Sequence, residues 1–251
     1  MAGDGADEAR GRPSVSYTGP DSRLNDLAVI LSDLARMFHE QQNVEDTLRG
    51  IVEAAVGTVP GAQHAALSMI ESRRVVKTRA GTDDLVYRVD QAQYDSGEGP
   101  CLSALYDQRT VRLSNMAAET RWPGFTARAA ALGVGSMLSF QLYAQQDNLG
   151  ALNLYSADTD AFDDESEHVG LLFAAHAAVA VVDARQQQQM SHAMAVRDLI
   201  GQAKGILMER HKLTGDEAFA LLVRASQHTN VKLHEVAREL VETGELAHRD
   251  R

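Results

Sequence analysis

Residues 137–156, MLSFQLYAQQDNLGALNLYS, decide the fold of the N-terminal part of this 251-residue chain. Two runs rich in residues that suit a pleated surface, Met137–Tyr143 and Gly150–Ser156, flank the polar stretch from Gln145 to Asn148. Two such runs joined by a short polar link predict a β-hairpin. We therefore expect a sheet that extends outward from these two strands.

Further short segments bounded by turn residues extend the predicted sheet. Before them, apolar residues recur at helical spacing from Leu24 to about Val56, with a break near Gln41–Asn43, which predicts two helices that pack on the sheet. A helical insertion is expected around Ala127–Leu132. These elements predict an α+β sandwich, a central antiparallel sheet with flanking helices. The remaining strands are expected at Ala65–Glu71, Val75–Ala80, Val86–Asp90 and Thr110–Leu113.

One long helix is predicted from about residue 165 to residue 210. Its apolar residues alternate at spacings of three and four for about five heptads, which is typical of a coiled-coil seam. Only Gln186 and Gln189 interrupt the seam, within the run QQQQ. We expect a parallel homodimer through this helix; packing on its own domain is the alternative. The seam positions are Leu172, Ala175, Val179, Val182, Gln186, Gln189, Ala193, Val196, Ile200, Ala203 and Leu207.

The chain after Lys212 predicts a compact helical unit. Residues Thr214–Glu217 read T-x-x-E, a capping box in which each of the two side chains satisfies an exposed backbone donor. The helix that follows should stop near Asn230, and a third apolar stripe begins at Leu233. Gly244 is the expected C-terminal stop. The tail is thus predicted to be an all-α three-helix domain.

Charge is distributed unevenly along the chain. Lys plus Arg number 24 against 35 Asp plus Glu, a net charge of −11, which argues against a protein that coats nucleic acid by bulk charge. Residues 191–251 carry nine basic and nine acidic side chains, so the excess acidity lies before them. The local basic surface from Arg197 to Lys232 indicates a polyanionic partner, with a solvated helix face as the alternative.

The composition also bears on localisation. A single cysteine cannot form an internal disulfide, and apolar runs are shorter than the roughly 20 residues that span a bilayer. Residues 1–22 have no hydrophobic period and no signal-peptide core, so we expect a disordered leader. These features predict a soluble cytoplasmic protein without a membrane partner.

Catalytic motifs are missing from the sequence. It has no P-loop, no GxGxxG, no zinc-ligand spacing and no Ser-His-Asp signature. Asp163, Asp164 and Glu165 begin the long helix, where negative charge suits the helix dipole, so capping explains them better than acid–base catalysis. We expect neither an enzyme nor a metal site, and no cofactor can be named.

The segment GEGPC, residues 97–101, is the most informative stretch in the middle of the chain. Two glycines around an acid permit a tight turn with exposed amides near a cavity mouth. Gly97, Glu98, Gly99 and Cys101 are therefore the ligand-pocket candidates. Cys101 is either a redox-sensing thiol or a small buried apolar residue.

With GEGPC, the turn LGVGS at 132–136, the strands MLSFQLY and NLGALNLYS, and Ala161-Phe162 before the long helix, the chain resembles a GAF sensor domain. The resemblance covers about 140 residues, within a domain placed at 23–183. It implies a sensory module that holds an unidentified small ligand between the sheet and its covering loops. Fold does not name that ligand.

Three family motifs for particular ligands are not met. Bilin-binding members have a histidine after the attachment cysteine, whereas Leu102 follows Cys101. Cyclic-nucleotide members have an Asn-Lys pair, whereas Leu154 follows Asn153, and Phe162 does not lead to the later Asp-Glu pair. His64 is the single haem-ligand candidate near the sheet and is weak support by itself.

The tail, RDLIGQAKGILMERHKLTGDEAFALLVRASQHTNVKLHEVARELV at 197–241, resembles the ANTAR domain over its whole length. We place this domain at 191–246. The resemblance implies binding to RNA stem-loops, commonly paired hairpins, and prevention of transcription termination. Basic side chains, amides and closely approached glycines are what recognition of RNA phosphates and loop bases requires. The candidate RNA-binding residues are Arg197, Gln202, Lys204, Gly205, Arg224, Ser226, Asn230 and Lys232.

Several of these residues have structural alternatives. Gly201 and Gly205 could serve tight helix packing, Asn230 could only cap a helix, and Lys212 could be a solvated charge. Two other functions stay open: a helix-turn-helix that binds DNA, which acidic Glu235 on the third helix disfavours, and a dimeric sensory adaptor for a protein partner. We expect RNA rather than DNA.

Overall fold

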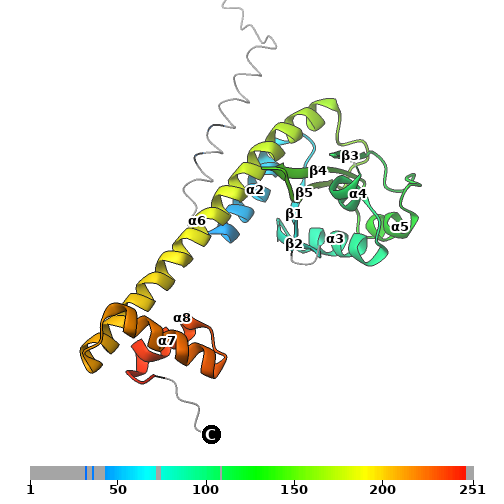
Figure 1. The fold of residues 1–251 in the computed structure, drawn as a ribbon. Coiled ribbons are helices and arrows are strands. Elements are labelled where there is room, and N and C mark those ends of the chain that lie inside the picture. Colours follow the sequence, from blue (N-terminus) through cyan, green and yellow to red (C-terminus); the bar gives the residue numbers. More distant parts are fainter. Residues whose placement is uncertain (1–31, 33–35, 37–42, 72–74, 108, 247–251) are drawn as a thin grey trace, which may run out of the picture. The chain divides into compact units, whose positions relative to one another are not determined.

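The computed structural model describes Ser32, Arg36 and residues 43–71, 75–107 and 109–246. The expected leader at 1–22 and nearly all of the helix expected from Leu24 to Phe38 lie outside the described residues. Two compact units are found, one consisting mainly of Glu45–Ala180 and one consisting mainly of the residues from Val181 onward. A single helix contributes residues to both (Figure 1).

The N-terminal unit is built on a five-stranded antiparallel sheet. Its strand order is β2-β1-β5-β4-β3, so the predicted hairpin supplies two neighbouring inner strands. The inner strands are buried along most of their length, so their side chains are covered on both faces of the sheet. The strands are β1 (His64–Ile70), β2 (Val76–Gly81), β3 (Thr110–Leu113), β4 (Ser136–Ala144) and β5 (Asp147–Ser156).

The hairpin between β4 and β5 is tighter than the sequence predicts. Ala144 pairs with Asp147, so only Gln145 and Gln146 form the turn. Both have positive φ, 52° and 71°, which matches a two-residue turn whose twist suits antiparallel strands. The prediction of the hairpin is confirmed, but β5 begins at Asp147, within the expected four-residue link.

The strand expected at Val86–Asp90 is wrong, because these residues lie in helix α3 (Asp84–Ser96). The Asp83 carboxylate caps the helix by accepting the backbone N–H groups of Leu85 and Val86. Gly97, at φ 71°, ends it. Capping at both ends and apolar residues at helical spacing outweigh the β propensity of two valines.

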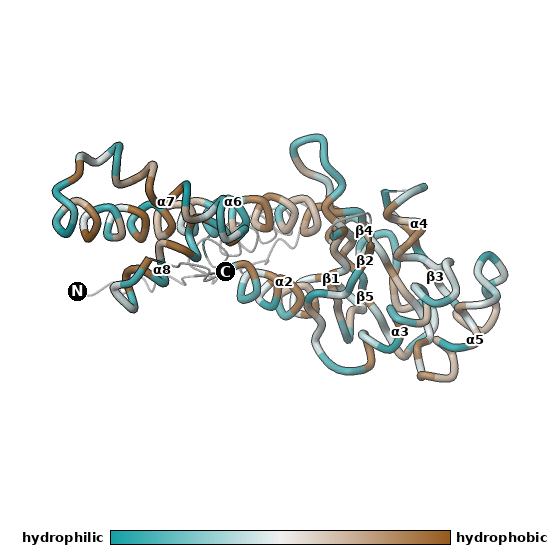
Figure 2. Tube along the Cα trace, turned by 60° about the horizontal axis from the view of Figure 1, so that its bottom comes forward, coloured by the Kyte–Doolittle hydropathy of each residue, from teal (hydrophilic) through white to brown (hydrophobic). Residues whose placement is uncertain are grey.

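Helices cover both faces of the sheet. On one face lie α3, α4 (Pro100–Tyr106) and α5 (Pro123–Ala131); on the other lie α2 (Val44–Thr58) and the start of α6 (Asp164–His211) (Figure 1). The hydropathy colouring in Figure 2 shows the apolar residues gathered where these layers meet. A Cβ on Gly170 would lie 2.4 Å from the Phe140 ring, so α6 reaches the sheet this closely only through a glycine.

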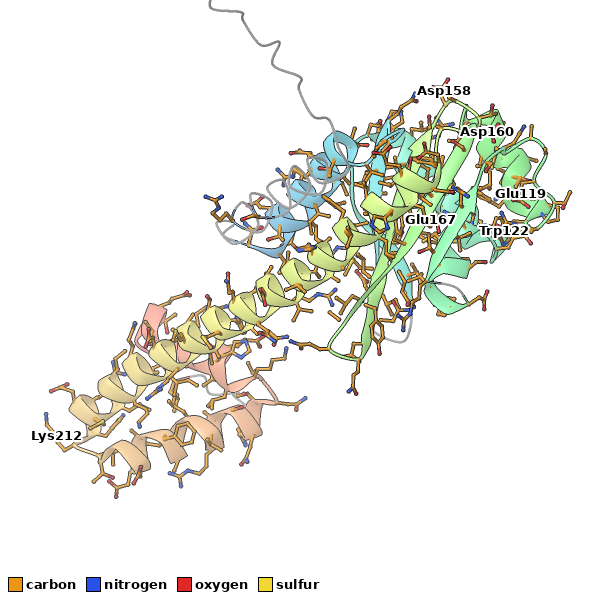
Figure 3. The ribbon with its side chains drawn as sticks, turned by 90° about the horizontal axis from the view of Figure 1, so that it is seen from above. Glu119, Trp122, Asp158, Asp160, Glu167 and Lys212 are labelled. Carbon is orange, nitrogen blue, oxygen red and sulfur yellow. The ribbon has the colours of Figure 1, made fainter. Side chains whose placement is uncertain are left out.

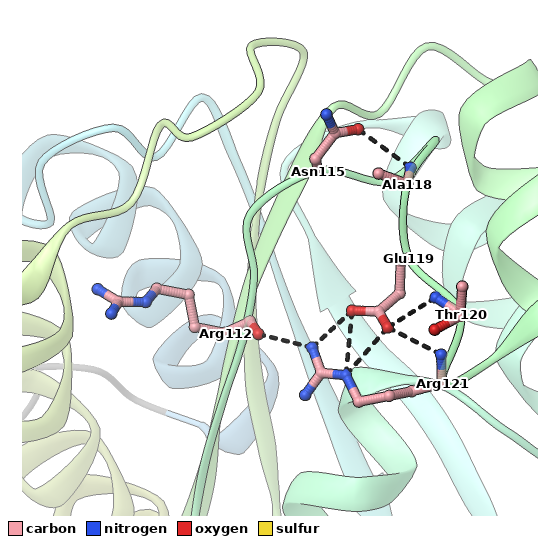
Figure 4. A network of polar contacts seen from close by, with 6 residues as sticks. All are labelled: Arg112, Asn115, Ala118, Glu119, Thr120 and Arg121. Atoms are coloured by element: carbon pink, nitrogen blue, oxygen red, sulfur yellow. Dashed lines mark hydrogen bonds and ion pairs between the residues drawn. The ribbon is translucent and has the colours of Figure 1, made fainter.

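The segment between β3 and α5 is held by one carboxylate. Glu119 accepts the N–H groups of Thr120 and Arg121 and the Arg121 guanidinium, which also donates to the Arg112 carbonyl at 3.0 Å (Figure 4). The side-chain hydrogen bond from Arg121 is the main cause of the lowered pKa of Glu119. Arg121 also lies 4.2 Å from the centroid of the Trp122 ring. These contacts fix the entry to α5.

Helix α6 is 48 residues long, and one 18-residue window is apolar enough to cross a membrane by length and composition alone. Of that window, 39% is buried inside the protein. Phe173, Ala177 and Val181 are at most 1% exposed, as expected of a core helix. The window is therefore weak support for a membrane span.

The C-terminal unit is a three-helix bundle of the end of α6, α7 (Gly215–Thr229) and α8 (Leu233–Thr243). The predicted capping box is present, with Thr214 and Glu217 each bonding to the other's backbone N–H, and Gly244 ends α8 at φ 75° as predicted. Its core consists of Ala203, Leu207, Ala218, Leu222, Val236, Ala237 and Leu240.

This core takes up the last part of the predicted coiled-coil seam. Ala203 and Leu207 are at most 1% exposed, because α7 and α8 fold back on α6. By contrast, Val179 is 55% exposed. The seam left for a partner helix is therefore shorter than predicted and ends before Ala203.

Candidate functional sites

Three unpaired basic side chains lie in the C-terminal unit near the junction of α7 and α8. Arg197, Arg224 and Lys232 are exposed, and among the described residues none has an acidic partner. The rings of His192 on α6 and His234 on α8 lie 6.4 Å apart, so α6 passes the start of α8. Arg197 is five residues, about 7.5 Å, further along α6. We call Arg197, Arg224, Asn230 and Lys232 the basic end.

Lys204 belongs to a second group. Its Nζ lies 5.9 Å from the centroid of the Phe219 ring, beside the first turns of α7. Phe219 and Asn230 are eleven residues apart, which is about 16 Å of helix. The sequence-predicted RNA residues are thus split between the two ends of α7.

The α7–α8 turn explains two further candidates. Ser226 Oγ donates to the Val231 carbonyl at 2.6 Å, so this hydroxyl holds the turn. Asn230 ends α7 with left-handed backbone, φ 55°, which asparagine tolerates better than most residues. Asn230 therefore caps α7, as the structural alternative expected. The residue is also exposed, at the basic end.

Gly201 and Gly205 of α6 have no packing role in the described chain. A Cβ on Gly201 or Gly205 would meet nothing within 4 Å, and both residues are exposed, as is Gln202. Tight packing within the bundle does not explain them. Lys212, at the α6–α7 turn, projects outward (Figure 3), and its Nζ lies 2.9 Å from Glu209 Oε1.

A row of polar side chains crosses the sheet of the N-terminal unit beneath α3 and α4. Thr78 pairs with Ser68 across β2 and β1, and Asn153 pairs with Ser139 across β5 and β4. Ser68, Ser139 and Asn153 are fully buried. We call Thr78, Ser68, Asn153 and Ser139 the polar row.

Asp90 of α3 is the centre of this site. Its fully buried carboxyl group accepts hydrogen bonds from several side chains of the sheet and from α3 itself. Burial raises its pKa, and these hydrogen bonds act in the opposite direction. The donors are Tyr155 at 2.5 Å, Thr78 at 2.7 Å, Gln93 at 3.0 Å, Ser68 at 3.1 Å and Asn153 at 3.3 Å.

Gly97, Glu98 and Gly99 form the turn between α3 and α4, and the fourth predicted pocket residue, Cys101, lies in the first turn of α4. Gly97 ends α3, and Gly99, at φ 140°, packs against Gln93, because a Cβ there would lie 2.4 Å from Gln93 Oε1. The Glu98 carboxylate accepts the N–H of Gly124 at the start of α5. The structure thus gives these glycines and Glu98 roles in shaping the turn, while Cys101 faces the polar row.

Cys101 is a buried thiol. Burial, followed by the nearby Asp90 carboxylate, raises its pKa to about 12, whereas interactions with Ser68 and Asn153 lower it. Thiolate is the reactive form of cysteine, so this environment favours the interpretation as a small buried residue over a redox sensor.

No group of three or more metal-ligating side chains is found among the described residues. The haem-ligand candidate His64 has its Nδ1 2.5 Å from the Asp83 carboxylate, at the cap of α3. A separate open groove of about 640 Å³ lies between α3 and α5, where Arg128 and Asp95 are 3.6 Å apart.

The comparisons with known proteins agree with these two units. A GAF domain model matches residues 41–182, and an ANTAR domain model matches residues 188–241. The first match covers more than half of the chain. The chain belongs to the GAF domain family. Its C-terminal unit is an ANTAR domain, so the chain is a sensor joined to a regulatory domain.

Solved structures share the fold of the GAF domain. The GAF domain from a phosphoenolpyruvate-protein phosphotransferase of Coxiella burnetii has 18% identity and a TM-score of 0.52, over 66% of this chain and 98% of that one. Free methionine-R-sulfoxide reductase from Neisseria meningitidis, in complex with its substrate, has 14% identity and a TM-score of 0.51, over 68% and 95%. No curated protein matches the chain. At these identities the likeness concerns the fold alone.

Sequence reasoning missed the polar row of the GAF domain and Asp90. Treating Val86–Asp90 as a strand hid the fact that Asp90 and Gln93 lie one turn apart on α3. The signal was available, since Asp83 is a favourable N-cap and Gly97 a favourable helix stop. The convergence of side chains from three strands on Asp90 could not be read from spacing.

Proposed function

We propose that this chain binds RNA stem-loops through its ANTAR domain and thereby prevents transcription termination, under the control of a small molecule sensed by its GAF domain. The observation that carries the proposal is the basic end: three exposed, unpaired cations on one small domain of an acidic chain. Because the chain as a whole repels polyanions, a local cluster is what allows selective contact with RNA.

The two groups of basic residues suit a folded RNA. The basic end offers guanidinium and ammonium groups for phosphates and the Asn230 amide for a base edge. Lys204, about 16 Å away along α7, can reach a second phosphate. Gly201 and Gly205 have no side chain, so an RNA backbone can approach the surface of α6 closely beside Gln202. Ser226 contributes by holding the turn.

The alternatives fit less well. A DNA-reading helix-turn-helix would place α8 in the major groove, but its exposed face carries Glu235, Glu239 and Glu242, which repel phosphates. A sensory adaptor would not need unpaired cations at one end. We infer that the chain is a regulator rather than an enzyme and acts in the cytoplasm.

We further propose that α6 forms a parallel homodimer. Val179, Met190 and Met194 are 55%, 65% and 61% exposed, an unusual run of apolar side chains on a helix surface. A partner helix would cover them and place two ANTAR domains side by side, as paired hairpins require. Sedimentation analysis should give a dimer that Val179→Glu weakens; a monomer across micromolar concentrations would contradict this.

The RNA proposal is tested by binding of the full chain to a tandem stem-loop RNA, a scrambled RNA and duplex DNA at near-physiological salt. Selective stem-loop binding is expected, with Lys204→Ala and Arg224→Ala each weakening it roughly three- to tenfold. Lys212→Ala is the matched control, because this lysine is already paired with Glu209. Equal binding to all three nucleic acids, or no binding, would overturn the proposal.

Antitermination itself needs a transcription assay. With a terminator placed behind the tandem stem-loops, the chain should increase read-through, and Arg224→Ala should reduce that increase in proportion to its loss of RNA affinity. Binding without a change in read-through would separate RNA recognition from antitermination and refute the latter.

A further inference from the structure

Two buried polar atoms of the GAF domain have no hydrogen-bond partner in the described chain: Ser139 Oγ and Asn153 Oδ1. Both residues are fully buried, and they face each other across β4 and β5. A buried polar atom left unpaired costs about 1–3 kcal/mol, so such pairs are uncommon in native proteins. They lie beneath α4, which contacts both strands.

The orientation of the Asn153 amide is fixed by its neighbours. Its Nδ2 donates to Ser68 Oγ at 3.0 Å and to Asp90 Oδ1 at 3.3 Å. Turning the amide over would place its oxygen against the Asp90 carboxyl group. The unpaired atom is therefore an acceptor, and the missing partner is a donor.

The charge of the site points the same way. Asp90 is the only carboxylic acid among the described buried residues, and no Lys, Arg or His is buried with it. An anion placed here would meet no compensating cation in surroundings of low dielectric constant. A neutral group avoids this penalty, and a positively charged group would have the Asp90 carboxylate as its counter-charge.

The surroundings of the two atoms are apolar. Cys101, Leu105 and Ala151 form one buried cluster with α4 on top, and the Cys101 thiol lies against Asn153. The start of α4 is tied to the Gln93 side chain at 2.8 Å, and its end is tied through the Leu105 carbonyl, which accepts from Gln141 and Asn148. A ligand with N–H donors would thus find hydrogen-bond acceptors on the sheet and apolar side chains under α4.

We propose that the GAF domain takes a small neutral or cationic ligand with N–H donors on a compact apolar body, bound by Asn153 Oδ1 and Ser139 Oγ beneath α4, and that it rejects anionic ligands such as carboxylates and phosphates. This inference rests on the sensing role proposed above. It narrows the ligand to amides, amines and amidines.

A matched series of probes tests the ligand class. Benzamide, benzamidine and benzoate have the same ring and differ in donors and charge. The full chain should be titrated with each at millimolar concentration by calorimetry and by thermal unfolding. We expect the amide and the amidine to bind and raise the unfolding temperature, and benzoate to do neither. Benzoate binding as tightly as the other two, or no binding by any of the three, would overturn the proposal.

Ser139→Ala tests the location. Removing one hydrogen bond should weaken amide binding about fivefold. The unliganded variant should unfold no more easily than the parent, because the lost hydroxyl has no partner. Ser136→Ala is the control on the same strand, where the hydroxyl already donates to the Asp158 carbonyl at 2.8 Å. Equal amide affinity in Ser139→Ala and the parent would contradict the site.

The outcome is separable from that of the RNA proposal. Stem-loop binding is measured on the same preparation without probe. A chain that binds RNA but does not discriminate among the three probes refutes the ligand class alone, and a chain that selects the amide without binding RNA refutes the ANTAR function alone.

Discussion

The side-chain oxygen of Gln93 accepts the backbone N–H of Cys101 at 2.8 Å, so that one amide on α3 fixes the start of α4. The same amide donates through Nε2 to Asp90 at 3.0 Å. A single buried residue therefore links the turn at GEGPC to the polar row beneath it. A movement of α4 on ligand binding would reach α3 through this residue.

Gln93→Met should destabilise the GAF domain by about 2–3 kcal/mol, because it leaves the Cys101 N–H unpaired and takes one donor from Asp90. Urea unfolding followed by circular dichroism measures the change. Gln91→Met is the control, since Gln91 is exposed on the same helix and bonds only to Asp95. Equal stability of the two variants would show that the Gln93 bonds contribute little.

Asp90→Asn should change how stability depends on pH. Burial raises the pKa of Asp90 above 3.8, so the folded chain keeps this proton to a higher pH than the unfolded chain does. The contribution of Asp90 to the free energy of unfolding is present below about pH 4 and falls as the pH rises towards the folded pKa. The stability of the parent relative to Asp90→Asn should therefore fall above pH 4. A constant difference from pH 4 to 7 would contradict the raised pKa.

Glu217→Gln should show the opposite slope. Hydrogen bonds from the backbone and side chain of Thr214 lower the pKa of Glu217 below 4.5. Its contribution is present above that pH and is lost as the pH falls through the folded pKa. The parent should lose stability relative to this variant on acidification, as read from unfolding of the ANTAR domain.

Thr214→Ala should destabilise the ANTAR domain by about 1 kcal/mol, the usual effect of removing an N-cap side chain. Its hydroxyl accepts the Glu217 N–H, and no other side chain caps α7. Thr229→Ala, at the C-terminal end of α7, is the comparison, because that hydroxyl donates to the Ala225 carbonyl at 2.8 Å within its own helix. The midpoint of thermal unfolding should be lower for Thr214→Ala than for the comparison variant.

Gly205→Ala should stabilise the fold and weaken RNA binding together. The added methyl group meets nothing within 4 Å, and alanine is favoured over glycine within a helix by about 1 kcal/mol. A close RNA backbone would meet that methyl group. Gly244→Ala should destabilise instead, because φ is 75° there. If Gly205→Ala kept full RNA affinity, close approach at this glycine would be refuted.

The sequence by itself determined the elements whose signals are local. The capping box at Thr214, the stop at Gly244 and the hairpin of β4 and β5 depend on residues a few positions apart, and all three form. The motifs that resemble the GAF and ANTAR domains depend on the same short-range spacing, and the family matches confirm them.

Tertiary structure decided what residues distant in sequence do together. Asp90 collects donors from four strand residues and Gln93, which no spacing rule connects, and its helix overrides the strand that two valines favour. Ala203 and Leu207 fit a coiled-coil seam by period, but α7 and α8 bury them first. The spacing of apolar residues along a helix indicates that one face is apolar. Which surface covers that face is decided only when the chain has folded.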